Sequence, residues 1–96
     1  MIIFDIETNG LLDDLDKVHC LVLKDTSTDK VETYTNNIQD GLKRLEQADC
    51  IIGHNIIKFD LPALKKVYDF NYKGKLRDTL VLTRLIWSDI KERDFQ

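Results

Sequence analysis

The segment Phe4-Asp5-Ile6-Glu7-Thr8 constrains the fold of this 96-residue chain more than any other feature. Apolar residues lead into the two carboxylates, which predicts a strand from Met1 to Ile6 in the centre of a covered sheet. Side chains of a strand alternate between its faces, so Asp5 and Glu7 point the same way, roughly 6.5–7 Å apart. Like charges this close resist simultaneous ionisation unless a cation lies between them. The pair is therefore a candidate site for Mg²⁺, which prefers carboxylate oxygens.

The composition fits one small globular domain with a single core, because 43% of the residues are hydrophobic and 32% are charged. The net charge of −3 argues against a domain that grips nucleic acid through a basic face. It leaves open a metal-dependent enzyme that acts on phosphates. The chain has no basic amino-terminal region followed by a long apolar stretch, so we expect a cytoplasmic protein.

The segment Val18–Lys24, which contains an apolar run, predicts a second strand, and Val31–Thr35, which alternates, predicts a third. Between them, the side-chain oxygens of Asp25–Asp29 can bond the local backbone, which predicts a turn and therefore a hairpin. A cation-binding loop at Asp25–Asp29 is the alternative. The segment lacks the glycine and the distal glutamate of a calcium loop, so we favour the turn.

The rest of the chain alternates between helix and strand. Apolar spacing and capping residues predict a helix over Asn37–Ala48 with Asn37 as N-cap, a strand over Asp49–Gly53, a helix from about Leu61 to Phe70 with Asp60 at its N-cap, a short strand over Lys75–Arg77, and a third helix capped by Asp78. The order β-β-β-α-β-α-β-α predicts an α/β fold with a mixed sheet whose faces are covered by helices.

Two segments, Phe4-Asp5-Ile6-Glu7-Thr8-Asn9-Gly10-Leu11 and His54-Asn55-Ile56-Ile57-Lys58-Phe59-Asp60, together resemble the first two motifs of the DEDD-type 3′→5′ exonucleases. That family has a ribonuclease H-like fold. The resemblance is closest to the proofreading domain of family-A DNA polymerases from short-tailed bacteriophages, and it covers nearly the whole chain. Asp-x-Glu alone is a weak signal, but it becomes specific when Asn-x-x-x-Phe-Asp follows about fifty residues later.

The resemblance implies that Asp5, Glu7 and Asp60 are catalytic residues and metal ligands. In that family two Mg²⁺ or Mn²⁺ ions, about 3.5–4 Å apart and bridged by the residue that matches Asp5, assist phosphodiester hydrolysis. They activate the attacking water and stabilise the leaving 3′ oxygen. The implied product is a nucleoside monophosphate.

The same resemblance implies a substrate pocket for the single-stranded 3′ end of DNA. Thr8 and the adjoining backbone would contact the terminal nucleotide, and Leu11 would wedge against the last bases. Asn55 and Phe59 would shape the pocket. A frayed strand suits such a site, because its bases are free to stack on apolar side chains.

The third motif of the family, a Tyr or His a few residues before a fourth carboxylate, has no counterpart in this sequence. We therefore expect residues 1–96 to form a single but partial exonuclease domain, truncated at its carboxy terminus. Three explanations stay open: a shortened chain, one half of a split enzyme completed by a separate polypeptide or polymerase domain, and a degenerate domain. The expected activity of the isolated chain is slow hydrolysis or none.

Each candidate residue also has a purely structural interpretation. Asp5 and Glu7 fit a solvated strand face, Asp60 and Asp78 fit helix N-caps, and Leu11 fits a core position. For Asp78, its place near the strand ends also allows a role in supporting a metal ligand. His54 we expect to satisfy local backbone groups.

The competing function is a non-catalytic interaction or nucleic-acid-binding module that keeps the exonuclease fold, since a fold alone does not fix function. It predicts no dependence on cations. It also predicts unchanged or improved stability when Asp5 and Glu7 are neutralised.

Overall fold

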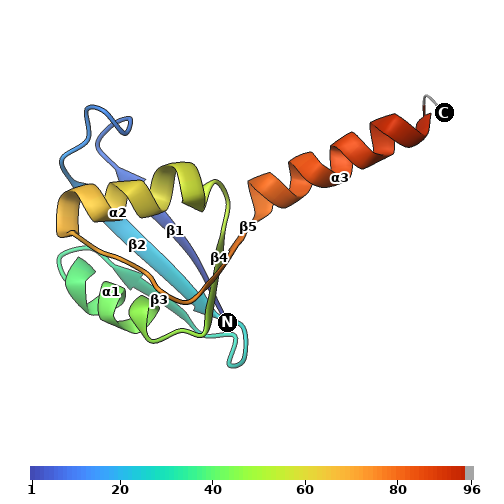
Figure 1. Cartoon of the computed structure of the whole chain (residues 1–96). Coiled ribbons are helices and arrows are strands. Elements are labelled where there is room, and N and C mark those ends of the chain that lie inside the picture. The colour runs from blue at the N-terminus through green and yellow to red at the C-terminus, as the bar shows by residue number, and fades with distance from the viewer. Residues whose placement is uncertain (95–96) are drawn as a thin grey trace.

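The computed structural model describes the backbone of residues 1–94 and the side chains of residues 1–86. Its centre is a five-stranded mixed sheet in the order β3-β2-β1-β4-β5 (Figure 1). The strands are β1 (Ile2–Thr8), β2 (Val18–Asp25), β3 (Val31–Tyr34), β4 (Cys50–Gly53) and β5 (Lys75–Asp78). β2 pairs antiparallel with β1 and β3, while β1, β4 and β5 run parallel. The predicted element order and mixed sheet are confirmed.

The helices are α1 (Ile38–Glu46), α2 (Leu61–Tyr68) and α3 (Thr79–Asp94), and a π-helical turn, η1 (Ile56–Asp60), leads directly into α2. α1 and α2 pack on one face of the sheet, as Figure 1 shows. The core between them and the strands consists of buried aliphatic and aromatic side chains: Ile2, Phe4, Ile6, Leu15, Val18, Leu21, Leu23, Ile38, Leu42, Leu45, Ile51, Ile56, Ala63 and Leu64. Leu15 comes from the loop between β1 and β2 and Ile56 from η1, while the others lie on the inward faces of the strands and of α1 and α2.

The opposite face of the sheet is open in the part of the chain that the structure describes. Along β1, Phe4 and Ile6 are buried, whereas Ile3 is 41% exposed and Asp5 and Glu7 are exposed. α3 leads away from the sheet in Figure 1. The prediction that helices cover both faces of the sheet is therefore wrong for the described residues. The reason is that α1 and α2 both pack on the other face, so that no described helix is left to cover this one once α3 leads away.

α3 carries apolar side chains into solvent: Val81, Leu82, Leu85 and Ile86 are between 41% and 64% exposed. No described element packs against these four residues as a core. Within residues 1–94, no helix is long and apolar enough to cross a membrane.

Asn37 and Asp60 occupy the N-cap positions of α1 and α2, as predicted, but neither side chain makes the expected capping bond. Asn37 makes no side-chain bond to the first turn of α1; its Oδ1 accepts from the backbone N–H of Thr35 at 3.3 Å. Asp60 lies inside a helical run, because η1 begins at Ile56, and it makes no side-chain capping bond. The third predicted cap is confirmed, since Asp78 accepts from the N–H of Leu80 at 2.9 Å.

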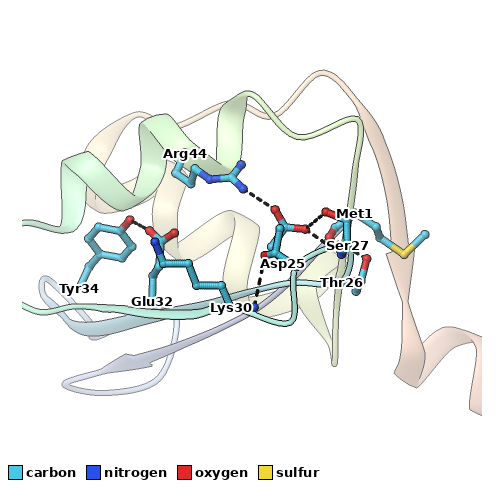
Figure 2. Close-up of polar contacts among 9 residues, drawn as sticks. Met1, Asp25, Thr26, Ser27, Lys30, Glu32, Tyr34 and Arg44 are labelled. Carbon is cyan, nitrogen blue, oxygen red and sulfur yellow. Dashed lines mark hydrogen bonds and ion pairs between the residues drawn. The ribbon is translucent and has the colours of Figure 1, made fainter.

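The β2–β3 turn is confirmed as a polar turn closed by its own side chains. Ser27 donates its backbone N–H and its hydroxyl to Asp25 Oδ1 at 2.9 and 2.6 Å, and Arg44 of α1 donates to Asp25 Oδ2 at 2.7 Å (Figure 2). The bonds from Ser27, with the charge of Arg44, hold the pKa of Asp25 below its ordinary value. Asp25 therefore has a donor for each carboxylate oxygen. Nearby, Tyr34 donates to Glu32.

Candidate functional site

The candidate site lies where the parallel strands β1, β4 and β5 end, an edge at which loop residues of open α/β sheets commonly form ligand sites. β1 contributes Asp5 and Glu7 on the open face, β4 leads into the turn that precedes η1, and β5 ends in Asp78. η1 ends in Asp60, which is only 4% exposed. Carboxylates far apart in sequence are thus brought to one edge of the sheet.

Asp60 is a buried carboxyl with an unsatisfied oxygen. Its Oδ2 has no hydrogen-bond partner among the described residues. Burial, followed by repulsion from Asp5, raises the pKa of Asp60 from 3.8 to about 7; a hydrogen bond from the backbone of Ile6 opposes this, and the charge of Asp78 adds to it. An unpaired buried acceptor costs free energy that a ligand cation would recover. This donor set fits a hard divalent ion.

The structure does not gather a complete ligand set. Asp5 and Asp60 are close enough for their charges to interact, and Glu7 shares the open face with Asp5. Among the described residues, however, no group of three or more His, Cys, Asp or Glu side chains is placed to share one ion. The assignment of Asp5, Glu7 and Asp60 as metal ligands stays a prediction.

Asp78 does more than the cap that its sequence position predicts. Its Oδ1 accepts from the N–H groups of Asn55 and Leu80, both at 2.9 Å, and of Val81 at 3.4 Å, while Oδ2 accepts from Ile57 at 3.0 Å. Burial alone would raise the pKa of Asp78, but the four backbone bonds outweigh it and the pKa is lowered. Asp78 is therefore held as an anion between the start of α3 and the turn after β4.

The turn after β4 depends on a glycine and an asparagine. A Cβ at Gly53 would overlap the side chain of Ile56 and lie 3.0 Å from the carbonyl oxygen of Phe4, so only glycine permits this approach to β1. Asn55 has a left-handed backbone with φ 59° and ψ 33°, a conformation that asparagine tolerates better than most residues. This gives Asn55 a structural role besides the predicted contact with substrate.

His54 lies exposed at the same turn, with its Nδ1 2.9 Å from the hydroxyl oxygen of Thr79. The expectation that His54 satisfies backbone groups is wrong at this atom, because the partner is a side chain that starts α3. With Ile3, Asp5 and Ile52, these two residues line a shallow hollow on the open face of the sheet. His54 and Asp5 thus line the same hollow.

The predicted substrate residues lie on two segments, the end of β1 with the loop that follows it and the turn with η1 that follows β4. The Thr8 hydroxyl donates to the carbonyl of Gly10 at 2.7 Å. Leu11 is 77% exposed, so the alternative that it belongs to the core is wrong. Phe59 is half-buried and packs against the core, and its N–H donates to the carbonyl of Asn55 at 3.0 Å. Contact of these residues with a substrate stays a prediction.

The hydrogen bonds that fix the loop carrying Leu11 were not predicted from the sequence. Asn9 donates to Asp16 Oδ1 at 2.6 Å, and its own Oδ1 accepts from the N–H groups of Asp16 and Lys17. From α2, Lys66 donates to the carbonyl of Leu12 at 2.9 Å. The short polar Asn9 at the end of β1 was the available signal for this closure.

Comparison with known proteins agrees with this geometry. A family model described as the RNase H superfamily matches residues 2–93. The DNA-directed DNA polymerases of Escherichia phage T7 and Enterobacteria phage T3 are 36% and 33% identical to this chain over 98% of its length. The chain spans 15% of the length of each of these relatives. The predicted resemblance to phage DNA polymerases is confirmed.

A solved structure shows the same fold at lower sequence identity. The family B DNA polymerase from the hyperthermophilic archaeon Pyrobaculum calidifontis matches with a TM-score of 0.62 and 18% identity, over 82% of this chain and 15% of that one. From the strand order, the carboxylates at the ends of the parallel strands and the match over residues 2–93, it follows that this chain belongs to the RNase H superfamily.

Proposed function

We propose that this chain is a metal-dependent 3′→5′ exonuclease domain that removes nucleotides from the single-stranded 3′ end of DNA, as part of a phage DNA polymerase acting in the host cytoplasm. The observation that carries the proposal is the buried Asp60, with one unpartnered oxygen, within electrostatic reach of Asp5. The similarity to two phage DNA polymerases supports a DNA substrate.

In this proposal Asp5, Glu7 and Asp60 hold Mg²⁺ or Mn²⁺. A divalent ion bound there would stabilise negative charge on the phosphate and lower the pKa of a bound water. Asp60 has no donor at Oδ2, so it gives up no hydrogen bond at that oxygen on binding a cation, and the cation would favour its ionised form. The exposed Leu11 stacks on the terminal bases, while Thr8, Asn55 and Phe59 bound the pocket.

The proposal includes a partner. The family's third motif supplies a fourth carboxylate, and this sequence has none at a matching distance. We propose that further polypeptide, in the same protein or a separate one, completes the site for full activity. The apolar side chains that α3 exposes are a surface on which such polypeptide can pack.

The test combines metal binding with strand cleavage. Mn²⁺ binding is measured by calorimetry for the wild-type chain, Asp5→Asn, Asp60→Asn and Asp40→Asn, the last removing an exposed charge from the first turn of α1. We expect wild type and Asp40→Asn to bind Mn²⁺ and the two site variants not to. With 3′-labelled and 5′-labelled single strands, we expect slow release of mononucleotides from the 3′ end that disappears in Asp5→Asn.

The second candidate function is a non-catalytic module with the same fold. It is favoured by one observation, the lack of any three-ligand group among the described residues. Failure of the wild-type chain to bind Mn²⁺, or binding without any Asp5-dependent cleavage, would select this candidate instead.

A further inference from the structure

We propose that Asp78 is a positioning residue for the candidate metal site: its buried carboxylate fixes the turn between β4 and α2 and so determines where Asp60 lies. The inference rests on the proposed function, in which Asp60 is a metal ligand. Asp78 itself is not proposed to bind metal or substrate.

The geometry begins with the pairing of β4 and β5. Gly53 lies opposite Asp78 in the parallel register, so the last residue of β5 reaches the turn that leaves β4. There Asp78 Oδ1 accepts from Asn55 at 2.9 Å and Oδ2 accepts from Ile57 at 3.0 Å. Two oxygens of one carboxylate thus hold two N–H groups of one turn.

A capping role does not explain these two bonds. A cap satisfies the first free N–H groups of its own helix, here those of Leu80 and Val81. A single side-chain oxygen is enough for that purpose, which is why Ser, Asn and Asp cap helices about equally well. The bonds to Asn55 and Ile57 run to another element and use the second oxygen as well.

The turn held by Asp78 is continuous with Asp60. The N–H of Phe59 donates to the carbonyl of Asn55, and the N–H of Leu61 donates to the carbonyl of Ile56, so residues 55–61 form one hydrogen-bonded unit. A displacement of Asn55 is therefore transmitted to Asp60. Such π-helical turns occur often at functional sites.

The experiment compares Asp78→Ser, Asp78→Asn and the matched charge control Asp40→Asn. Serine can cap α3 but is too short to hold the turn after β4. Asparagine keeps one acceptor oxygen and replaces the other with an amide that cannot accept from an N–H. Backbone amide exchange and ¹H–¹⁵N spectra report on residues 55–60 and on Leu80, and calorimetry reports the affinity for Mn²⁺.

We expect Asp78→Ser to speed amide exchange at Asn55 and Ile57 roughly tenfold or more while Leu80 keeps its protection. Affinity for Mn²⁺ falls roughly 10–100-fold, the range seen when residues that orient metal ligands are changed. Asp78→Asn lies between Asp78→Ser and wild type in both measurements. Asp40→Asn matches wild type.

The two simplest alternatives give different results. A pure capping role predicts that Asp78→Ser and Asp78→Asn leave residues 55–60 unchanged, and this result would overturn the inference. A disturbed turn with unchanged affinity for Mn²⁺ would also overturn it. If the wild-type chain binds no Mn²⁺, the proposed function fails, whereas the exchange data still decide whether Asp78 fixes the turn.

Discussion

Two carboxylates at opposite ends of the sheet, Asp25 and Asp60, have opposite environments. Asp25 follows the β2–β3 ladder and receives donors from Ser27 and Arg44, which lower its pKa (Figure 2). Asp60 is buried, has one oxygen without a donor, and has its pKa raised to about 7. The first carboxylate stabilises the fold as an anion. The second, as an anion, destabilises the folded state, and a bound cation would reverse this effect. This difference separates a structural aspartate from a candidate metal ligand.

The largest effect expected from this difference is stabilisation by metal. A ligand at 100 times its Kd stabilises the folded state by about 2.7 kcal/mol, which raises the Tm of a domain this size by roughly 10–20 °C. We expect saturating Mn²⁺ to produce such a shift in wild type and none in Asp60→Asn. Asp25→Asn is the control, since it lowers the starting Tm but keeps the shift. An equal shift in Asp60→Asn would remove Asp60 from the site.

The next effect is on stability as a function of pH. Because the pKa of Asp60 is about 7 when folded and 3.8 ordinarily, the unfolded chain releases this proton first as pH rises. The metal-free protein therefore loses stability between about pH 4 and pH 7, on the order of a few kcal/mol. Asp60→Asn should remove this loss, as chemical denaturation across the pH range will show. The contribution of Asp25 to stability changes with pH in the opposite direction. Because its pKa is lowered, Asp25 stabilises the fold above about pH 4, and this contribution disappears in acid.

A smaller effect is expected from Gly53→Ala, which tests the backbone of the site. The added Cβ would lie 3.0 Å from the Phe4 carbonyl and overlap Ile56, and such overpacking costs roughly 1–3 kcal/mol. Gly10→Ala is the matched control in the neighbouring loop, because its nearest contacts would be at 3.8 Å. Thermal unfolding should separate the two variants. Equal melting temperatures would mean that β4 and β1 can move apart without cost.

The smallest effect is expected from Arg44→Ala, which removes one donor from Asp25. The pair is partly solvent-exposed, with Arg44 36% and Asp25 20% exposed, and exposed ion pairs contribute little to stability. Ser27 still donates twice to Asp25. We expect a slight decrease in Tm at neutral pH, reduced further by salt, and no change in Mn²⁺ affinity. A large loss of Mn²⁺ affinity would show that the two ends of the sheet are coupled.

Much of the fold could be predicted because its signals are local. Apolar runs predicted β1 and β2, alternation predicted β3, and helical spacing predicted α1 and α2. The predicted strand and helix bounds agree with the observed ones to within a few residues. The missing capping bonds at Asn37 and Asp60 have different origins: the Asn37 Oδ1 accepts from Thr35 instead, whereas Asp60 lies inside a helical run. A cap depends on where a helix begins, and the π-helical turn moved the start of the second helical segment back to Ile56.

The candidate site was predicted only in part. The spacing of Asp5 and Glu7 indicated a shared face, and that face is confirmed. The environment of Asp60 could not be predicted from the spacing of residues along the chain. Nor could the hydrogen bonds that Asp78 accepts from Asn55 and Ile57, because these residues meet only through the pairing of β4 with β5. The closure of the Leu11 loop by Asn9 is local, within eight residues, and was missed although Asn9 itself was an available signal.

The sequence by itself determined the order of strands and helices, the face that Asp5 and Glu7 share, and the superfamily. These follow from patterns that repeat every two or every three to four residues and from two short motifs. Only the tertiary structure decided which carboxylates have donors, that one face of the sheet stays open over the described residues, and that Asp78 connects α3 to the turn beside Asp60. Burial and hydrogen bonding depend on which distant segments meet, and the pKa of a carboxyl depends on both.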